Sequence, residues 1–473
     1  MLFNSMVFIW IFLPIVIIGN FLLSKIAFSN EAKQYKAKNS FLLICSLIFY
    51  AWGGIYYLLI MISSIIINYL GGFLIDKLPK KKLILIITIS LNLLVLFYFK
   101  YFNLLIDCIE NMGHSLNFKE IVLPIGISFF TFQAMSYVID VYWGNVKAQK
   151  NIINFALYVS LFPQLIAGPI VQYKDIESQL MHRQETTLTF LQGQKRFCYG
   201  LAKKVIIANT MAKVADGIWT LDTTRLGYQI AWLGIISYTL QIYFDFSGYS
   251  DMAIGLGKML GFDFKENFNY PYTSLSIREF WRRWHISLSS WFRDYVYIPL
   301  GGNRKGNTRT YINIFIVFLL TGIWHGANFT FWIWGIYYGL LLIIERLFLG
   351  KILEKNPIKV INWLYSILLV MLGWIFFRSD NLSQAIEYIK QLFTPTNADY
   401  NILSYISMNY LTTLFIAILL GGLIQRIFKK LYQKIKNHIF VIIFDYLIQF
   451  ILLLVCIRMI VSGTYNAFIY FQF

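Results

Sequence analysis

Charged side chains are scarce in this chain of 473 residues: they make up 14% of it, whereas hydrophobic residues make up 58%. A soluble domain carries about 25% charged residues, because its surface has to be covered with polar groups. The chain therefore lacks the polar surface of a soluble protein. Apolar blocks long enough to cross a bilayer recur along it and predict an all-α polytopic membrane protein with about ten to twelve spans.

Cysteine is also scarce, and the common catalytic signatures are missing. The four cysteines are far apart and form no CxxC pair, so they indicate neither a disulfide framework nor a metal site (Cys45, Cys108, Cys198 and Cys456). The sequence contains no GxSxG elbow, no HExxH motif, no Walker A loop and no carboxylate pair suited to glycosidic chemistry. The familiar hydrolase, zinc-protease and nucleotide-hydrolase classes therefore have no support.

Acidic residues are outnumbered by basic ones, 23 against 41, which gives a net charge of +18. In a soluble protein this excess would suggest nucleic acid, but here the basic residues lie between apolar blocks, as the positive-inside rule predicts. We therefore expect no nucleic-acid partner and assign the basic clusters to the cytoplasm. They occupy residues 33–38, 77–82, 147–150, 195–204, 278–309, 346–359 and 426–436.

The apolar stretch at residues 6–23 lacks a basic n-region and an A-x-A cleavage site, so we expect a first membrane span rather than a signal peptide. The AWGG sequence at residues 51–54 predicts a turn between two spans, which places the N-terminus outside the cytoplasm. Because no linker or repeat interrupts the chain, we expect one membrane domain over residues 1–473, with its motifs concentrated in residues 120–345.

The longest polar interval contains interleaved tryptophan and arginine, REFWRRWHISLSSWFRD. Ser276 followed by Glu279 predicts a capping box at a helix start. Five residues recur at three- and four-residue steps and would share one face of a continuous helix: Trp281, Trp284, His285, Leu288 and Phe292. This pattern predicts one amphipathic helix at the cytoplasmic interface, which Pro299 and the glycines after it would end.

The stretch TGIWHGANFTFWIW, residues 321–334, places His325 inside an apolar run. An ionisable side chain in a span is costly and needs a reason. Burial keeps an imidazole neutral, so His325 could accept a proton near pH 7 as a general base does. His285 lies on the apolar face of the amphipathic segment. For either residue the alternative is a hydrogen-bonded structural histidine; the other three histidines lie in polar contexts.

Two carboxylates, Asp245 and Asp251, lie in the apolar run YFDFSGYSDMAIG. We expect each to pair with an arginine of the 278–304 segment, with a role at the reaction centre as the alternative. The segment FPQLIAGPI, residues 162–170, contains two prolines and a glycine, and such irregular backbone at membrane depth has to be covered by protein or line a cavity. The arginines of 278–304 follow the positive-inside rule, but some could bind the phosphates of a donor.

These stretches resemble the membrane-bound O-acyltransferase superfamily, in the branch that contains the membrane subunit of bacterial alginate O-acetylation. The similarity is carried by LPIGISFFTFQAMSYVIDVY, FPQLIAGPI, DFSGYSDMAIG, NFNYPYTSLSIREFWRRWHISLSSWFRDYVYIPLGG, TGIWHGANFTFWIWG, GWIFFR and FIYFQF. They extend from end to end of the chain. The resemblance implies tilted, amphipathic and re-entrant helices around a central tunnel.

By resemblance, His325 is the catalytic residue, and His285, which precedes it by 325 − 285 = 40 positions, is the second polar residue of the site. We also assign eight residues to donor binding or to the tunnel wall: Arg282, Arg283, Arg304, Trp284, Trp324, Asn328, Asp245 and Asp251. His325 either acts as a base toward an acceptor hydroxyl or is itself transiently acetylated, and the sequence leaves both routes open.

The resemblance implies a bacterial cytoplasmic-membrane enzyme that takes an acetyl group from acetyl-CoA, without a permanently bound cofactor or metal. A separate SGNH-hydrolase-like acetyltransferase would place the group on an extracellular or cell-wall polysaccharide. One alternative is D-alanyl transfer from a carrier-protein thioester to teichoic acid. A channel or transporter is a second, although no corresponding broken helices from repeated halves are seen. A membrane scaffold is a third.

Overall fold

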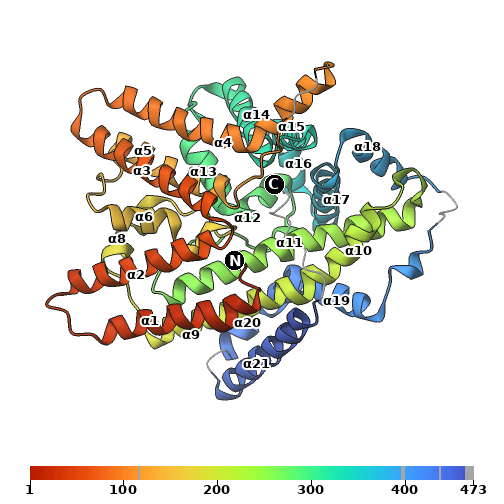
Figure 1. Ribbon diagram of the computed structural model, residues 1–473. Helices are drawn as coiled ribbons and strands as arrows, with labels where there is room; N and C mark the ends of the chain where they lie inside the picture. Colours follow the sequence, from red (N-terminus) through yellow and green to blue (C-terminus); the bar gives the residue numbers. More distant parts are fainter. Residues whose placement is uncertain (115–117, 396–399, 436–437, 464–473) are drawn as a thin grey trace. The chain divides into compact units, whose positions relative to one another are not determined.

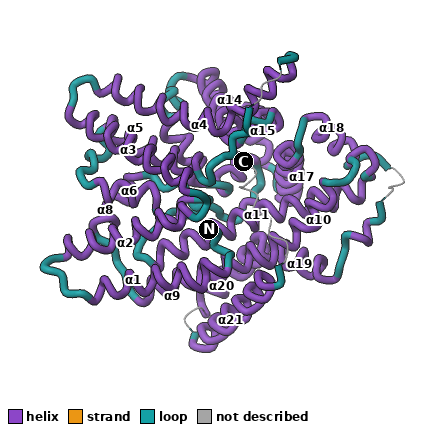
Figure 2. The backbone as a smooth tube through the Cα atoms, in the orientation of Figure 1, coloured by secondary structure: helices purple, strands orange, loops and turns teal. Residues whose placement is uncertain are grey.

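A computed structural model describes residues 1–114, 118–395, 400–435 and 438–463. Figure 2 shows that the described residues are helices joined by loops, without strands, so the predicted all-α class is confirmed. The chain divides into two compact units that interleave in the sequence. The first contains residues 1–197 and 249–265, and the second contains residues 198–248 and 266–473. The prediction of a single domain remains a prediction.

The first unit is an assembly of helices (Figure 1), most of which are apolar. They are α1 (Leu13–Lys25), α2 (Glu31–Ala51), α3 (Ile55–Lys77), α4 (Lys81–Asn111), α5 (Ile127–Trp143), α6 (Ile152–Ser160), α7 (Phe162–Leu165), α8 (Tyr173–Met181) and most of α9 (Thr187–Ala202), with a π-helical turn, Phe8–Phe12, before α1. The predicted turn at residues 51–54 lies between α2 and α3. Asn68 and Asn92 exchange two hydrogen bonds of 2.9 Å between α3 and α4, a polar contact that holds apolar helices together.

Irregular backbone at residues 161–170 is buried in the first unit, as predicted. The short helix α7 follows α6 directly, and the backbone N–H of Phe162 donates to the Ser46 hydroxyl of α2 at 3.1 Å. Gly126 packs so closely on this segment that a methyl group there would lie 2.6 Å from the Leu165 carbonyl oxygen, and its φ of 78° also favours glycine. Protein atoms therefore cover the backbone that two prolines keep out of a regular helix.

The second unit begins at Cys198, within α9, which continues as a π-helical turn, η2 (Lys203–Ala208). Its helices are α10 (Asn209–Trp219), α11 (Gly227–Met259, shared with the first unit), α12 (Ile277–Arg283), α13 (Ile286–Phe292), α14 (Gly306–His325), α15 (Phe329–Ile344), α16 (Gly350–Lys355), α17 (Lys359–Arg378), α18 (Leu382–Gln391), α19 (Met408–Ile418), α20 (Ile424–Ile435) and α21 (Ile439–Val461). Short 3₁₀ or π-helical turns lie between several of these helices: η3 (Thr223–Arg225), η4 (Pro271–Thr273), η5 (Arg293–Tyr297), η6 (Glu345–Leu349), η7 (Ile402–Ser404) and η8 (Leu419–Leu423).

Helices α14 and α15 pack against each other as a hairpin in the second unit (Figure 1). Small residues allow this close approach, because a methyl group at Gly335 would lie 2.5 Å from the Phe318 carbonyl oxygen. Close packing through small residues is how helices associate in a bilayer, where lipid is as apolar as the side chains. The hairpin fixes the turn at residues 326–328, directly after His325.

Five described helical segments are long and apolar enough to cross a membrane by length and composition: Phe8–Lys25, Ile55–Lys77, Lys81–Asn111, Lys359–Arg378 and Ile439–Val461. This finding supports a multi-pass membrane protein. The predicted count of ten to twelve spans is not confirmed. Two other helices, α11 and α14, are also long and carry buried polar residues, among them Asp245 and Asn313.

The prediction of one continuous amphipathic helix after Ser276 is wrong. The capping box is present, because the Ser276 hydroxyl accepts from the Glu279 N–H at 3.0 Å. However, α12 ends at Arg283, and His285 has a φ of 44° before α13 begins. The break is stabilised by the preceding loop: the Ile286 N–H donates to the Asn267 carbonyl oxygen at 2.9 Å. A bond to this distant loop replaces a bond within the helix.

Candidate active site

His325 lies at the end of α14, where Gly326 takes an extended conformation and ends the helix. The ring is almost buried, with 6% of the residue exposed. Three aromatic rings surround it at centroid distances of 4.9 Å (Trp324), 5.0 Å (Trp334) and 4.9 Å (Phe377). They come from α14, α15 and α17, so packing between these helices sets the position of the imidazole.

His285 lies between α12 and α13 and is oriented by a polar contact. Its Nδ1 is 3.1 Å from Oδ1 of Asn267. The same oxygen accepts from the backbone N–H of Ser287 at 3.2 Å, which identifies this side-chain atom as the amide oxygen. An amide oxygen only accepts, so Nδ1 carries the proton and Nε2 carries the lone pair. The contact therefore selects the tautomer whose basic nitrogen is Nε2.

The surroundings of His285 keep its ring uncharged. The residue lies outside the helices that are long enough to span a membrane, and burial lowers its pKa to about 3 because the charged form is poorly solvated. The Phe246 ring packs edge-on against it at 4.6 Å. A neutral imidazole at pH 7 is able to accept a proton, which is a requirement of a general base.

Trp324 connects the two histidines. Its ring centroid is 6.4 Å from that of His285 and 4.9 Å from that of His325. Trp284 lies farther out, where its ring is 4.9 Å from Trp374 and 5.1 Å from Phe268. The structure therefore brings together both histidines and Trp324, and it places Trp284 in the aromatic layer around them.

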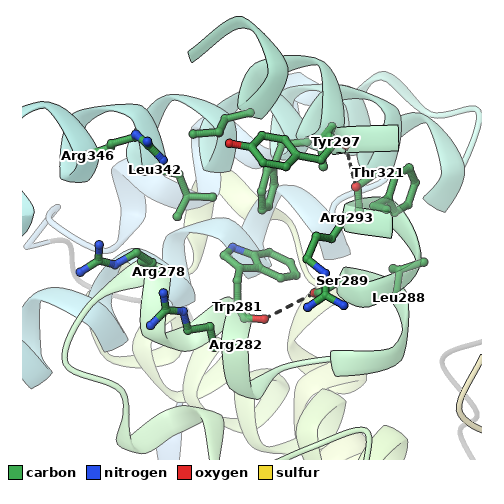
Figure 3. Close-up of a pocket in the computed structure, with 14 residues that line it drawn as sticks. Arg278, Trp281, Arg282, Leu288, Ser289, Arg293, Tyr297, Thr321, Leu342 and Arg346 are labelled. Atoms are coloured by element: carbon green, nitrogen blue, oxygen red, sulfur yellow. Dashed lines mark hydrogen bonds between the residues drawn. The ribbon is translucent and has the colours of Figure 1, made fainter. Parts of the chain in front are cut away.

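A cavity of about 270 Å³ opens beside this cluster, and we call it the arginine pocket. Its charged lining residues are Arg278, Arg282, Arg293 and Arg346. Figure 3 shows the indole of Trp281 near the centre, with Arg278, Arg282 and Arg346 on one side and Thr321 on the other.

The apolar wall of the arginine pocket approaches His325. Thr321 lines the pocket one helical turn before His325 on α14. The Trp281 ring packs on Trp334 at 5.5 Å, and Trp334 packs on His325 at 5.0 Å. One side chain therefore separates the wall of the pocket from the imidazole. The arrangement suits a ligand with an anionic end at the arginines and an apolar or reactive end pointing inward.

Comparison with known proteins decides the family. The model of the membrane-bound O-acyltransferase family (MBOAT) matches residues 146–378. The probable alginate O-acetylase AlgI of Pseudomonas aeruginosa is 46% identical over 403 residues, which cover 83% of this chain and 75% of that protein. The chain belongs to the membrane-bound O-acyltransferase family. It is therefore a membrane O-acyltransferase.

Two other relatives of this acyltransferase are named for two different reactions. The peptidoglycan O-acetyltransferase of Helicobacter pylori is 36% identical, with 82% of this chain and 79% of that protein covered. The teichoic acid D-alanyltransferase of Bacillus subtilis is 29% identical, but the match covers only 47% of this chain and 59% of that protein. The similarity to the O-acetyl-transferring relatives thus extends over more of the acyltransferase.

The three arginines predicted to bind the donor occupy different environments. Arg282 lines the arginine pocket and forms no ion pair with the residues that the structure describes. Arg283 instead donates to the Glu279 carboxylate at 2.9 Å and to the Asn269 carbonyl oxygen at 3.1 Å. Arg304 is exposed in the loop before α14, outside the pocket lining.

The sequence did not single out three other arginines of the pocket. Arg278 pairs with Glu354 at 2.6 Å, and Arg293 pairs with Asp294 at 2.8 Å. Arg346 forms no ion pair with a described residue and comes from the far end of the α14–α15 hairpin. Only the close packing of that hairpin brings it to α12. The sequence could have pointed to Arg346 only through a prediction that α14 and α15 pair as an antiparallel hairpin.

The expected partners of the two intramembrane carboxylates were wrong. Asp245 is buried in the second unit and pairs with Lys204 at 2.5 Å, and Asp251 in the first unit pairs with Arg196 at 2.8 Å. Neither of these partners belongs to the 278–304 segment. The reason is that α9 and its π-helical continuation run beside α11, so their basic side chains are within reach.

Asn328 supports the turn after His325 rather than the pocket wall. Its side-chain oxygen accepts from the Thr330 N–H at 3.0 Å and caps α15, and its amide nitrogen donates to the Asp380 carbonyl oxygen at 2.5 Å. These contacts tie the start of α15 to the end of α17. The residue therefore helps to hold the helices whose rings surround His325.

Proposed function

We propose that this acyltransferase moves an acetyl group from cytoplasmic acetyl-CoA across the bacterial cytoplasmic membrane, where it is used to O-acetylate an extracellular or cell-wall polysaccharide. The observation that carries the proposal is the placement of the arginine pocket one side chain from His325. Coenzyme A carries phosphates at one end and the thioester at the other. A guanidinium group matches phosphate oxygens in geometry and charge. Coenzyme A could therefore bind with its phosphates at the arginines and its thioester toward His325.

In the proposed reaction, His325 removes the proton from an acceptor hydroxyl as the hydroxyl oxygen attacks the thioester carbon. The new C–O bond forms, the C–S bond breaks, and the proton passes from the imidazole to the departing thiolate of coenzyme A. The surrounding rings exclude water, which protects the thioester from hydrolysis. His285 would use its basic Nε2 to align the acceptor or a bound water within the same cluster.

The acceptor is proposed to be extracytoplasmic because the arginines of the pocket belong to two basic segments of the chain, 278–309 and 346–359, which the positive-inside rule assigns to the cytoplasm. The relatives named for alginate and for peptidoglycan acetylation support a polysaccharide as the final target. Delivery to the sugar is proposed to involve a separate SGNH-hydrolase-like acetyltransferase. The N-terminus is proposed to lie outside the cytoplasm, because the basic cluster at residues 33–38 follows the first apolar stretch.

A donor assay tests the acetyl proposal against D-alanyl transfer. The purified protein in lipid nanodiscs is given radiolabelled acetyl-CoA or a carrier protein charged with D-alanine, and release of coenzyme A or of free carrier is followed. With an acceptor present, we expect turnover with acetyl-CoA and none with the charged carrier. Turnover with the charged carrier, and none with acetyl-CoA, would overturn the proposed donor.

A second assay separates base catalysis from covalent catalysis. The protein is incubated with labelled acetyl-CoA in the absence of an acceptor, quenched and digested, and the peptides are analysed by mass spectrometry. Base catalysis predicts that no label remains on His325. Label on His325 that disappears when an acceptor is added would assign an acetyl-imidazole intermediate instead.

A further inference from the structure

A second cavity of about 640 Å³ lies in the second unit, and we call it the polar pocket. It is lined by α10, by the segment 403–410 that leads into α19, and by the end of α21. Its lining includes Asn209, Lys213, Ser404, Ser407, Tyr410 and Met459. The polar pocket and the arginine pocket have no lining residue in common, so the polar pocket is a separate site.

The polar pocket lies at the ends of two apolar helices. Met459 is in the last turn of α21, which is long and apolar enough to cross a membrane, and Tyr410 is in the first turn of the shorter apolar helix α19. A spanning helix crosses the hydrocarbon core, so its ends lie among the lipid headgroups. Residues 402–407 form a 3₁₀ turn and a loop, and such backbone does not occur against hydrocarbon. The pocket is therefore at the level of the headgroups.

Exposed apolar surface begins directly beside the polar pocket. Only 11% of the apolar stretch of α21 is buried inside the described protein. Val455, one turn before Met459 on the same face of α21, is exposed. On α19, Leu411 and Phe415 follow Tyr410 and are exposed as well. A molecule that has a polar head in the pocket and apolar chains along α19 and α21 would match both surfaces.

The polar lining of the pocket indicates the charge and the hydrogen-bonding groups of that head. Asn209 is buried, with 6% exposed, and its side-chain oxygen has no hydrogen-bond partner among the described residues. A buried amide oxygen needs a donor, such as a hydroxyl group of a ligand. Lys213, one turn later on α10, is exposed and has no ion pair with a described residue, and the lining contains no carboxylate. The pocket therefore suits an anion that also carries hydroxyl groups.

We propose that the polar pocket binds the headgroup of an anionic phospholipid of the phosphatidylglycerol type, with the phosphate at Lys213 and a glycerol hydroxyl donating to Asn209. The acyl chains then cover the exposed faces of α19 and α21. Such a lipid links α10, α19 and α21, and it adds to the hydrogen bond of 2.7 Å that the Tyr199 hydroxyl donates to Asp445 of α21. Binding should therefore stabilise the fold. This site does not depend on the proposed acetyl transfer.

Native mass spectrometry of the full chain, released from detergent micelles, tests this proposal. The protein is titrated with dioleoyl phosphatidylglycerol or dioleoyl phosphatidylcholine, and the fraction that carries the first lipid gives the dissociation constant. We expect the phosphatidylglycerol to bind about tenfold more tightly than the phosphatidylcholine. Lys213→Gln should weaken phosphatidylglycerol binding by about tenfold, and Lys213→Arg should retain it. Lys351→Gln, which removes an exposed lysine of α16, is the matched control and should bind as the unmodified protein does.

Thermal unfolding in the same micelles gives a second measurement. Phosphatidylglycerol should raise the Tm of the unmodified protein and of Lys351→Gln, because a ligand that binds the folded state stabilises it. The increase should be smaller in Lys213→Gln and in Asn209→Leu, which removes the buried amide oxygen. If Asn209→Leu does not fold, Lys213→Gln alone decides the outcome, because its side chain is exposed.

Equal phosphatidylglycerol affinity in Lys213→Gln and in the unmodified protein overturns the proposal, and so does equal affinity of the unmodified protein for the two lipids. A further titration uses glycerol 1-phosphate, which has the same headgroup chemistry without acyl chains. If it displaces the phosphatidylglycerol at an equal concentration, the pocket is a site for a free phosphate ester and the lipid assignment is wrong. His325→Ala should bind phosphatidylglycerol as the unmodified protein does, because its side chain lies outside the polar pocket.

Discussion

His285 and His325 are held in place by different kinds of contact. His285 is oriented by a hydrogen bond from Nδ1 to Asn267 and lies at a strained backbone position with φ of 44°. His325 is at a helix end and is surrounded by aromatic rings from three helices. A hydrogen bond fixes which nitrogen is protonated, whereas packing fixes only where the ring lies. The two histidines should therefore respond to different substitutions.

The largest effect is expected at His325. His325→Gln keeps most of the side-chain volume but removes the basic nitrogen, so we expect acetyl transfer to fall by about 10²–10⁴-fold, the usual contribution of a general base. Turnover of acetyl-CoA and O-acetyl ester on the surface polymer of the host are the measurements. His438→Gln, at an exposed histidine, is the matched control. Unchanged turnover in a correctly inserted His325→Gln protein would reject the base.

A smaller loss of turnover is expected on substitution of Asn267, whose side chain orients His285. Asn267→Leu removes the acceptor for Nδ1–H of His285, so the other tautomer becomes populated and turnover should fall by about tenfold to a hundredfold. A structural role alone would lower expression or thermal stability and leave the turnover of the folded fraction unchanged.

Asn267→Asp tests the same contact with His285 through the pH dependence of the reaction. A carboxylate beside Nδ1 favours the charged imidazole, so the pKa of His285 should rise from its lowered value. His285 can accept a hydrogen bond at Nε2 only while its ring is neutral, so the acidic limb of the kcat/KM profile should move to higher pH. A pH profile that coincides with that of the unmodified protein would show that His285 does not take part in the titrating step.

Substitutions in the arginine pocket are expected to weaken the binding of acetyl-CoA and to leave kcat nearly unchanged. Arg282→Gln and Arg346→Gln each remove a guanidinium that lines the pocket, and each should raise the KM for acetyl-CoA by about tenfold with little change in kcat. Arg283→Gln is the matched control, because Arg283 binds Glu279 instead of lining the pocket. Equal KM values for Arg282→Gln and Arg283→Gln would count against a phosphate role for the pocket.

The smallest effect is expected at the cap of α15. Asn328→Ala and Asn381→Ala both remove a side-chain cap, of α15 and α18 respectively, and each should destabilise the protein by about 1 kcal/mol. Thermal unfolding measures this loss. Only Asn328→Ala should also lower kcat, because α15 carries Trp334 against His325. Equal turnover in the two variants would show that the cap does not position the imidazole.

The sequence predicted features that depend on local patterns. Apolar blocks and sparse charge identify the helical membrane class, and Ser276 with Glu279 identifies a helix start that the structure confirms. The break after Arg283 was not predicted, because it depends on hydrogen bonds from a loop that precedes the helix. For the same reason Asn267 could not be singled out, since nothing in its own neighbourhood distinguishes it from a loop asparagine.

Ionic partners were the least predictable part of the candidate site. Asp245 was expected to pair with an arginine of the 278–304 segment, but it pairs with Lys204. Charges in an apolar interior need a nearby opposite charge, and the sequence shows only that such a partner has to exist. Which of 41 basic residues takes that place depends on which helices run side by side.

By itself the sequence determined that this chain is a membrane protein made of helices and that two histidines in apolar surroundings need an explanation, because hydrophobicity and helix caps act over a few neighbouring residues. Tertiary structure alone decided that Trp324 joins those histidines, that Arg346 reaches α12, and that Asn267 selects the tautomer of His285. Each of these contacts joins segments that the chain separates, and only the packing of helices brings them within bonding distance.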